Sequence, residues 1–361
     1  MRILSRVCRK FHRNERGQVA ILVGVMMTGL IGFSALAIDV GSLASDKRDL
    51  QNAADAMALA GAQDLPSQFD ATSTARTWAT KNDVSEDEVA SIEVHQQDLH
   101  RVPAELNPTI VVTLHRHHRT TLARVIGIDS VDLEVTASAV KTSPGGSEGV
   151  TPWSVLESAV KGATPGQLTT LKWDANNILQ GNTMPIQIDG SGGAVYEETI
   201  KHGSVGTLCS QEALANGCSP TAAECLDATC DSLTGDKIGP TKKGLQYIYA
   251  NTDPACNEFN QVFTPNDDGT YRLNQKCNPF VEGSKSSLRV LIVPVIESLG
   301  NGTSPVTIKE FGLFFLDGTK SKCTGNDCLI EGRFIRANFT TGSVIGIYDP
   351  DGLMHFIRLV E

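Results

Sequence analysis

The sequence predicts an α+β protein in which an N-terminal transmembrane helix extends into an alanine-rich helix, followed by a small α+β module and a β-rich, sandwich-like domain that contains disulfides. Three observations predict this class: an uncharged apolar run, a helical hydrophobic period that continues past it, and a later change to short strand-like runs separated by turn residues. The expected segments are a basic cytoplasmic head (1–17), a transmembrane helix (18–38), an alanine-rich helical extension (39–65), a small α+β module (66–141), a linker (142–149) and a β-rich exported domain (150–361).

The basic head differs in charge from the rest of the chain. Of the 31 Lys and Arg residues among 361, six lie in the first 17 positions, where Glu15 is the single acidic residue. The remaining chain therefore holds 25 basic and 40 acidic side chains, a net charge of −15. Because phosphate backbones repel so acidic a surface, the composition argues against nucleic acid as a partner.

Residues 18–38 carry no charged side chain. As a helix this run is about 32 Å long, which is enough to cross a bilayer core. The basic head favours a cytoplasmic N-terminus, so we expect a single-pass protein of the cytoplasmic (inner) membrane whose bulk lies outside the cytoplasm or at the cell surface. The Ala35–Ala37 triplet also fits a signal-peptidase site, but the length of the run and the helical pattern beyond it favour a retained anchor.

Small residues recur at every fourth position, first within the span and again in the extension, inside the sequence LQNAADAMALAGA (50–62). The predicted helix-packing face comprises Gly24, Thr28, Gly32, Ala54, Ala58 and Ala62. Small side chains let a second helix approach closely, so we expect this face to contact another subunit or a second copy of the chain. Two alternatives stay open: the span has an ordinary membrane-helix composition, or the alanines cover the strands expected within 91–140.

The chain beyond Pro66, which ends the helix, divides into short elements. In the α+β module we expect helices at 70–82 and 120–127 and strands at 91–95, 109–114 and 131–140. In the β-rich domain we expect strands at 168–173, 184–189, 287–298, 306–317, 331–339 and 353–360, with short helices near 194–202 and 240–251. Strands with turn residues at this spacing are typical of a sandwich-like fold.

Eight of the nine cysteines lie in the last 153 residues, whereas Cys8 lies in the basic head. An even set in one region predicts four disulfides and an oxidising compartment, with Cys8 left free. The candidates are Cys209, Cys218, Cys225, Cys230, Cys256, Cys277, Cys323 and Cys328. Eight cysteines allow 105 pairings, and the sequence does not choose among them.

Three short motifs resemble sites of chemistry, and each has a simpler interpretation. GGSEG (145–149) matches the G-x-S-x-G pattern with Ser147 as nucleophile, but it lies in the expected linker. DGSGG (189–193) is similar to a metal-binding loop, but Gly193 stands where a serine is expected. HRHHR (115–119) offers three histidines, but its arginines oppose a cation. We therefore expect no catalytic residue, no metal and no cofactor.

The N-terminal stretch resembles the TadE/TadG-like proteins of Tad (Flp) pilus assembly. The resemblance runs through ERGQVAILVGVMM (15–27), ALAIDVGSL (35–43) and, most specifically, LQNAADAMALAGA (50–62). ARTWATKN (75–82) and TLARVIGIDSVDLEVTASA (121–139) are similar to the downstream part of such proteins. The resemblance implies a bitopic or pilin-like protein that serves a type IVb-like pilus and its secretion machinery, with other subunits as partners of the N-terminal helix.

Processing of the N-terminus stays open at this point. Gly17 fits a prepilin-peptidase site, but Leu22 occupies the position five residues later where a processed pilin has glutamate. Two functions of different classes are expected. The first is a membrane-anchored, exported structural protein of a Tad/Flp pilus or its secretion machinery, as a minor pilin-like or platform subunit. The alternative is a cell-surface adhesin that recognises a carbohydrate or host ligand independently of any pilus.

Overall fold

The computed structural model describes residues 15–97, 107–174, 182–233, 237–266, 269–280, 287–299, 302–318, 322–324, 327–339 and 344–360. The basic head before Glu15, with Cys8, lies outside the described residues. The chain forms two compact units. The N-terminal unit comprises Met1–Ala58, Ser73–Glu93 and Val111–Ala137, and the C-terminal unit comprises Leu59–Thr72, Val94–Ile110 and Ser138–Glu361.

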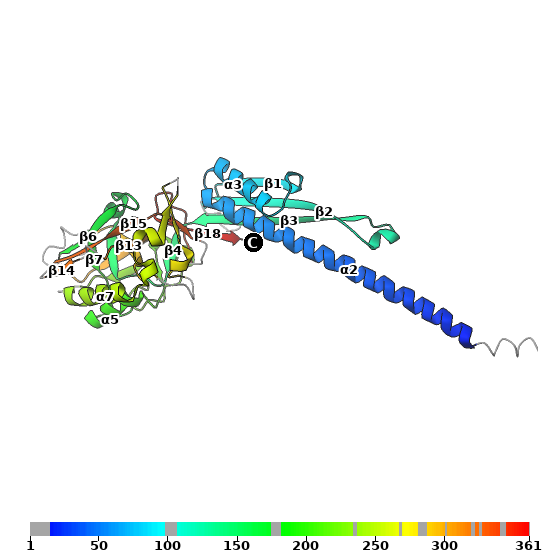
Figure 1. Ribbon diagram of the computed structural model, residues 1–361. Helices are drawn as coiled ribbons and strands as arrows, with labels where there is room; N and C mark the ends of the chain where they lie inside the picture. The colour runs from blue at the N-terminus through cyan, green and yellow to red at the C-terminus, as the bar shows by residue number, and fades with distance from the viewer. Residues whose placement is uncertain are drawn as a thin grey trace, which may run out of the picture. The chain divides into compact units, whose positions relative to one another are not determined.

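One continuous helix, α2 (Glu15–Gly61), contains both the predicted span and the start of the predicted extension (Figure 1). The run is helical because it contains no proline and many strong helix formers. It ends in the single turn η1 (Ala62–Asp64), just before Leu65 and Pro66. In the described part of the chain, this is the one helix long and apolar enough to cross a membrane.

The two halves of α2 differ in exposure. From Val19 to Val40 the large apolar side chains are exposed by 52% to 77%. From Leu50 onward, Leu50, Ala54 and Met57 are fully buried. So long a run of exposed apolar residues is costly in water, whereas it is what a bilayer-spanning segment requires.

The rest of the N-terminal unit is built around neighbouring strands. The elements are α3 (Gln68–Lys81), η2 (Glu86–Glu88), β1 (Val89–His95), β2 (Thr109–Arg119), η3 (Ala123–Ile126) and β3 (Ser130–Thr142), with β2 between β1 and β3. Burial alternates along the first part of β3, where Leu133 and Val135 are buried, whereas residues 137–142 are all buried. The strand β2 is longer than predicted, and the helix expected at 120–127 is a single turn.

The C-terminal unit contains an eight-stranded sheet. Its strand order is β14-β15-β13-β12-β5-β7, with β6 paired to β15 and β9 paired to β13. The bounds are β5 (Trp153–Leu156), β6 (Leu168–Asp174), β7 (Thr183–Pro185), β9 (Thr229–Asp231), β12 (Val290–Ile296), β13 (Pro305–Leu316), β14 (Lys322–Thr324) and β15 (Asp327–Ile335). The strands predicted at 168–173, 287–298 and 306–317 are present with small differences at their ends. The strand predicted at 184–189 is confined to Thr183–Pro185, and the one predicted at 331–339 is divided between β15 and a separate strand at Ala337–Phe339.

Both faces of this sheet are buried, which explains why β12 is apolar throughout. Leu291, Val293 and Val295 face one core, whereas Ile292 and Ile296 face the other. The helices α5 (Gly193–His202) and α7 (Ile238–Asn251) contribute to the first core and pack closely where Gly244 meets Ile200. Helices thus cover one face of the sheet, whereas we expected a second sheet there, as in a sandwich-like fold. The α+β class itself is confirmed.

Smaller elements complete the C-terminal unit. They are β4 (Pro144–Ser147), α4 (Glu157–Lys161), β8 (Leu208–Cys209), α6 (Gln211–Ala215), η5 (Pro254–Cys256), α8 (Phe259–Val262), β10 (Phe263–Pro265), β11 (Tyr271–Leu273), η6 (Gln275–Cys277), β16 (Ala337–Phe339), β17 (Val344–Ile345) and β18 (Met354–Val360). The buried strand β4 pairs with β8 and β17. Residues 142–149, for which we expected a linker, are therefore part of the fold.

The eight C-terminal cysteines form four disulfides, as predicted. The pairs are Cys209–Cys218, Cys225–Cys230, Cys256–Cys277 and Cys323–Cys328. Each joins cysteines near one another in sequence, with separations of 5 to 21 residues. The disulfides therefore fix local loops of the C-terminal unit.

Candidate functional sites at the helix exit and in a two-arginine pocket

The six residues of the predicted helix-packing face fall into two groups. Gly24, Thr28 and Gly32 are exposed on the apolar half of α2, and added Cβ atoms at the two glycines would meet no neighbour within 4 Å. Ala54, Ala58 and Ala62 are fully buried within the fold of the described chain. The six residues therefore do not form one continuous exposed face, because the alanines already serve the protein's own core.

Asp39 joins the end of the predicted span to the loop before η3. Its carboxylate is buried and accepts hydrogen bonds from the backbone N–H groups of Thr121, Leu122 and Ala123, the first two at 2.9 Å. These three N–H groups lie at the start of the helical turn η3. A carboxylate is favourable there, as at a helix N-cap, because it accepts hydrogen bonds from N–H groups that have no partner within the turn. We call this contact the Asp39 clamp.

A second contact between α2 and β2 lies one turn further along. The buried His118 places Nδ1 2.6 Å from Asp46 Oδ2 and Nε2 3.2 Å from Ser42 Oγ. His117, on the opposite face of β2, pairs with Asp132. His118 thus joins β2 to α2 and His117 joins it to β3, and no metal-binding group of His, Cys, Asp or Glu occurs among the described residues.

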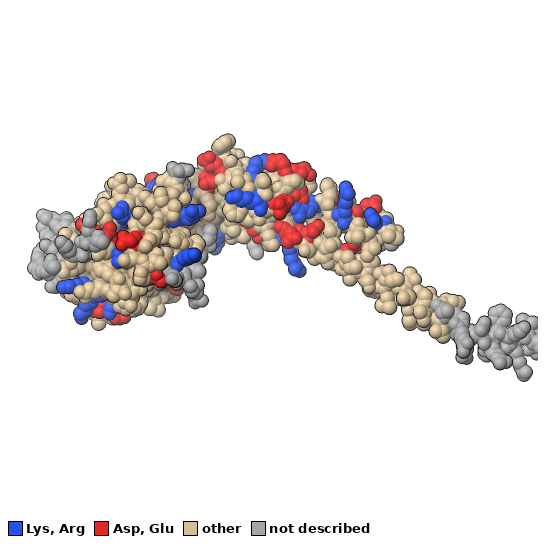
Figure 2. Space-filling model, viewed as in Figure 1, with Lys and Arg blue, Asp and Glu red and all other residues tan. Residues whose placement is uncertain are grey.

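The loop held by Asp39 exposes apolar side chains. Val125 is 82% exposed, and Leu122 and Ile128 are exposed by 39% and 47%. Arg119 and Arg124 on the same loop are also exposed. Figure 2 shows the adjacent half of α2 without charged side chains. A loop of this composition beside a bilayer-spanning helix fits the membrane interface, where apolar side chains insert and arginines meet lipid headgroups.

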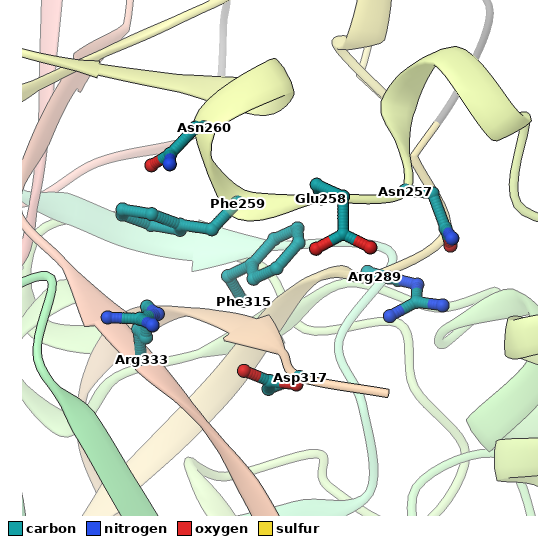
Figure 3. Close-up of a pocket in the computed structure, with 8 residues that line it drawn as sticks. All are labelled: Asn257, Glu258, Phe259, Asn260, Arg289, Phe315, Asp317 and Arg333. Carbon is teal, nitrogen blue, oxygen red and sulfur yellow. The ribbon is translucent and has the colours of Figure 1, made fainter. Parts of the chain in front are cut away.

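The C-terminal unit contains a pocket of about 380 Å³, lined by Asn257, Glu258, Phe259, Asn260, Arg289, Phe315, Asp317 and Arg333 (Figure 3). In that view the guanidinium groups of Arg289 and Arg333 lie on opposite sides of the Phe315 ring. Arg289 is only 7% exposed. Burial lowers its pKa, although the nearby Tyr249, Glu258 and Asp317 act in the opposite direction. The sequence analysis did not find this pocket.

The two glycine-rich motifs have structural roles. Ser147 lies in β4, and its hydroxyl donates to the backbone carbonyl of Glu148. The carboxylate of Asp189 accepts hydrogen bonds from the backbone N–H groups of Val205 and Gly206, and so joins two loops. Both motifs therefore take part in the hydrogen bonding of the C-terminal unit.

An exposed apolar helix on a disulfide-bonded, mixed α+β body defines a membrane-anchored protein. Residues 17–64 match the Tad family model, described as Flp pilus-assembly TadE/G-like. The match confirms the family predicted from these residues and, with the apolar helix, supports a pilus-associated protein with a structural role. Neither the curated proteins nor the solved structures include a match to this chain.

Proposed function

We propose that the chain is a single-pass structural subunit of a Tad/Flp (type IVb-like) pilus or of its secretion machinery. Residues 18–38 span the cytoplasmic membrane, the basic head lies in the cytoplasm, and the chain beyond Asp39 lies outside it. The observation that carries this proposal is α2, whose exposed apolar half and buried alanine-rich half together lie almost entirely within the segment matched by the family model.

The first half of α2 supports a contact with another subunit. Gly24, Thr28 and Gly32 form a stripe of small residues on the membrane-side half, where large apolar side chains occupy the other faces. Tight packing and close backbone approach drive helix association in lipid, so this stripe fits a helix of a pilin, a secretion-system subunit or a second copy. The subunit is thus minor pilin-like or platform-like.

The experiment is complementation of a strain that lacks this gene, with pili counted by electron microscopy and measured in sheared fractions. The native chain restores pili, whereas the Thr28→Leu variant does not, because leucine keeps the span apolar but blocks close approach. Met26→Phe adds bulk on the opposite face of the helix and serves as the matched control. Normal pili in the deletion strain contradict the proposal, as does full complementation by Thr28→Leu.

A second candidate function rests on a different observation. The pocket in the C-terminal unit contains a buried arginine whose Nε has no hydrogen-bond partner in the described chain, which favours ligand recognition. An adhesin that acts without a pilus would keep ligand binding in a strain devoid of pili. A pilus subunit would lose surface display under the same condition.

A further inference from the structure

The inference starts from the unusual state of Arg289. Its guanidinium is buried, and among the described residues its Nε finds no hydrogen-bond partner and its charge no ion-pair partner. A buried charge without a paired, hydrogen-bonded counterion is expensive, so its presence requires an explanation, and a ligand that pairs with it would supply one. The contact that the structure does show is the ring of Tyr249, 5.0 Å from the guanidinium carbon.

The fold holds this arginine in place. Arg289 directly precedes β12, and its backbone carbonyl accepts a hydrogen bond from Leu316 of the neighbouring strand β13. Gly318 leaves room for the guanidinium of Arg289, because a Cβ atom at position 318 would lie 2.4 Å from Nη1 of this arginine. The sheet thus fixes the backbone of Arg289, and the close fit beside Gly318 limits where its guanidinium can lie before any ligand binds, which reduces the entropic cost of binding.

Further unpaired polar atoms surround the same pocket. Asn257 Oδ1 and Arg333 Nε are buried and have no hydrogen-bond partner among the described residues. Arg333 is held by a 2.6 Å hydrogen bond from Nη1 to the carbonyl of Gly166 and lies 4.8 Å from the Phe259 ring centre. The pocket therefore offers two fixed donor groups and an acceptor to one ligand.

The remaining lining selects the chemistry of that ligand. Phe259 and Phe315 form an apolar floor, with their ring centres 5.6 Å apart. Asn260 is exposed at the rim, and Glu258 and Asp317 supply carboxylates. Aromatic faces pack against the C–H face of a sugar ring, while amides and carboxylates hydrogen-bond to its hydroxyls. The two carboxylates repel a doubly charged phosphate more strongly than a singly charged carboxylate, and a carboxylate matches the geometry of a guanidinium.

We propose that this pocket binds an acidic monosaccharide unit, such as a uronic acid at the end of a glycan. The sugar carboxylate pairs with Arg289, the ring packs on Phe259 and Phe315, and its hydroxyls meet the amide and carboxylate groups of the lining. A volume of about 380 Å³ accommodates one sugar ring. This inference does not depend on the proposed pilus role, because the pocket lies wholly within the C-terminal unit.

The test is a binding titration of the full chain in detergent micelles by ligand-observed NMR and calorimetry. The probes are D-glucuronate, D-glucose, which lacks the carboxylate, and N-acetylglutamate, which has a carboxylate but no sugar ring. We expect glucuronate to bind at least about tenfold more tightly than either comparator. Equal binding of N-acetylglutamate indicates a peptide carboxylate site and overturns the proposal, as does the absence of glucuronate binding.

Two variants and a control assign the binding to the pocket. Arg289→Gln weakens glucuronate binding at least about tenfold and does not lower the melting temperature, because it removes an unpaired buried charge. Phe259→Leu weakens glucuronate binding but leaves the weak binding of acetate unchanged. Arg272→Gln, a matched change of an exposed arginine outside the pocket, has no effect. Unchanged glucuronate binding in folded Arg289→Gln contradicts the inference.

Discussion

Asp39 Oδ2 lies 2.9 Å from the backbone nitrogen of Leu122, a residue 83 positions later in the chain. This hydrogen bond joins the first charged residue after the apolar run to the loop that follows β2. The two sequence stretches that resemble the pilus-assembly family, ALAIDVGSL and TLARVIG, are thus in direct contact. In our account, the Asp39 clamp sets the point at which α2 leaves the bilayer.

Replacing Asp39 with asparagine should loosen this loop. The amide keeps the size of the side chain but loses the charge and one acceptor oxygen, so the three backbone N–H groups are no longer all satisfied. We expect faster hydrogen exchange at Thr121, Leu122 and Ala123 and a lower melting temperature. Asp129→Asn, on the same loop, is the control and should change neither. Unaltered exchange at the three amides in Asp39→Asn would mean that the clamp is dispensable.

The exposed apolar loop should lie in the membrane interface. A Val125→Cys variant that carries an environment-sensitive fluorophore should be quenched by spin-labelled lipid when the protein is reconstituted in nanodiscs. The control is Thr80→Cys on α3, which lies at the other end of the N-terminal unit (Figure 1) and should not be quenched. Equal quenching at the two positions would refute the interfacial placement.

His355 should make the fold sensitive to mild acid. The side chain is 3% exposed, its Nε2 lies 2.9 Å from the carbonyl of Asp349, and its Nδ1 has no hydrogen-bond partner in the described chain. Burial lowers its pKa to about 4 from an ordinary value of 6.5. The unfolded chain therefore binds more protons between these values, so stability is full above pH 6.5 and falls toward pH 4. His355→Gln should lose less stability than the native chain between about pH 7 and pH 5 in urea unfolding, and an equal loss would contradict the prediction.

Glu310 should act in the opposite direction. Burial, together with the nearby carboxylates of Asp349 and Glu157, raises its pKa to about 7 from an ordinary value of 4.5. The folded chain therefore binds more protons between these values, and the contribution of Glu310 to stability falls as the pH rises from 4.5 to 7. Glu310→Gln should be more stable than the native chain at about pH 8, and this advantage should shrink at about pH 5. Urea midpoints at the two pH values measure the difference, and a constant advantage would refute the assignment.

Much of the fold follows from local patterns in the sequence. The long helix α2 and the strands β12, β13, β15 and β18 were predictable because hydrophobic period and turn residues act over short distances. The sequence does not decide whether Ala54 and Ala58 face a partner helix or the protein's own core, because small residues suit both equally. Disulfide pairing and the role of residues 142–149 depend on which loops the fold brings together, and no local pattern carries that information.

The pocket was beyond prediction for the same reason. Its residues come from four separate stretches, at 257–260, 289, 315–317 and 333. In the sequence, Arg289 stands just before an apolar strand, which is typical of a solvated strand end. Only the three-dimensional arrangement shows that it is buried. By contrast, the Tad segment was predictable because its family signature is continuous in sequence.

The central claim, that α2 crosses the membrane once with the basic head inside, is tested most directly by thiol labelling. Eight cysteines are in disulfides, so Cys8 is the native reporter of the head, and a Thr80→Cys substitution at an exposed position of α3 adds a reporter thiol beyond Asp39. A membrane-impermeant maleimide is applied to intact spheroplasts and to permeabilised ones. Our account predicts labelling of the introduced thiol in intact spheroplasts and of Cys8 only after permeabilisation. Labelling of Cys8 in intact spheroplasts, or protection of the introduced thiol until permeabilisation, would contradict it.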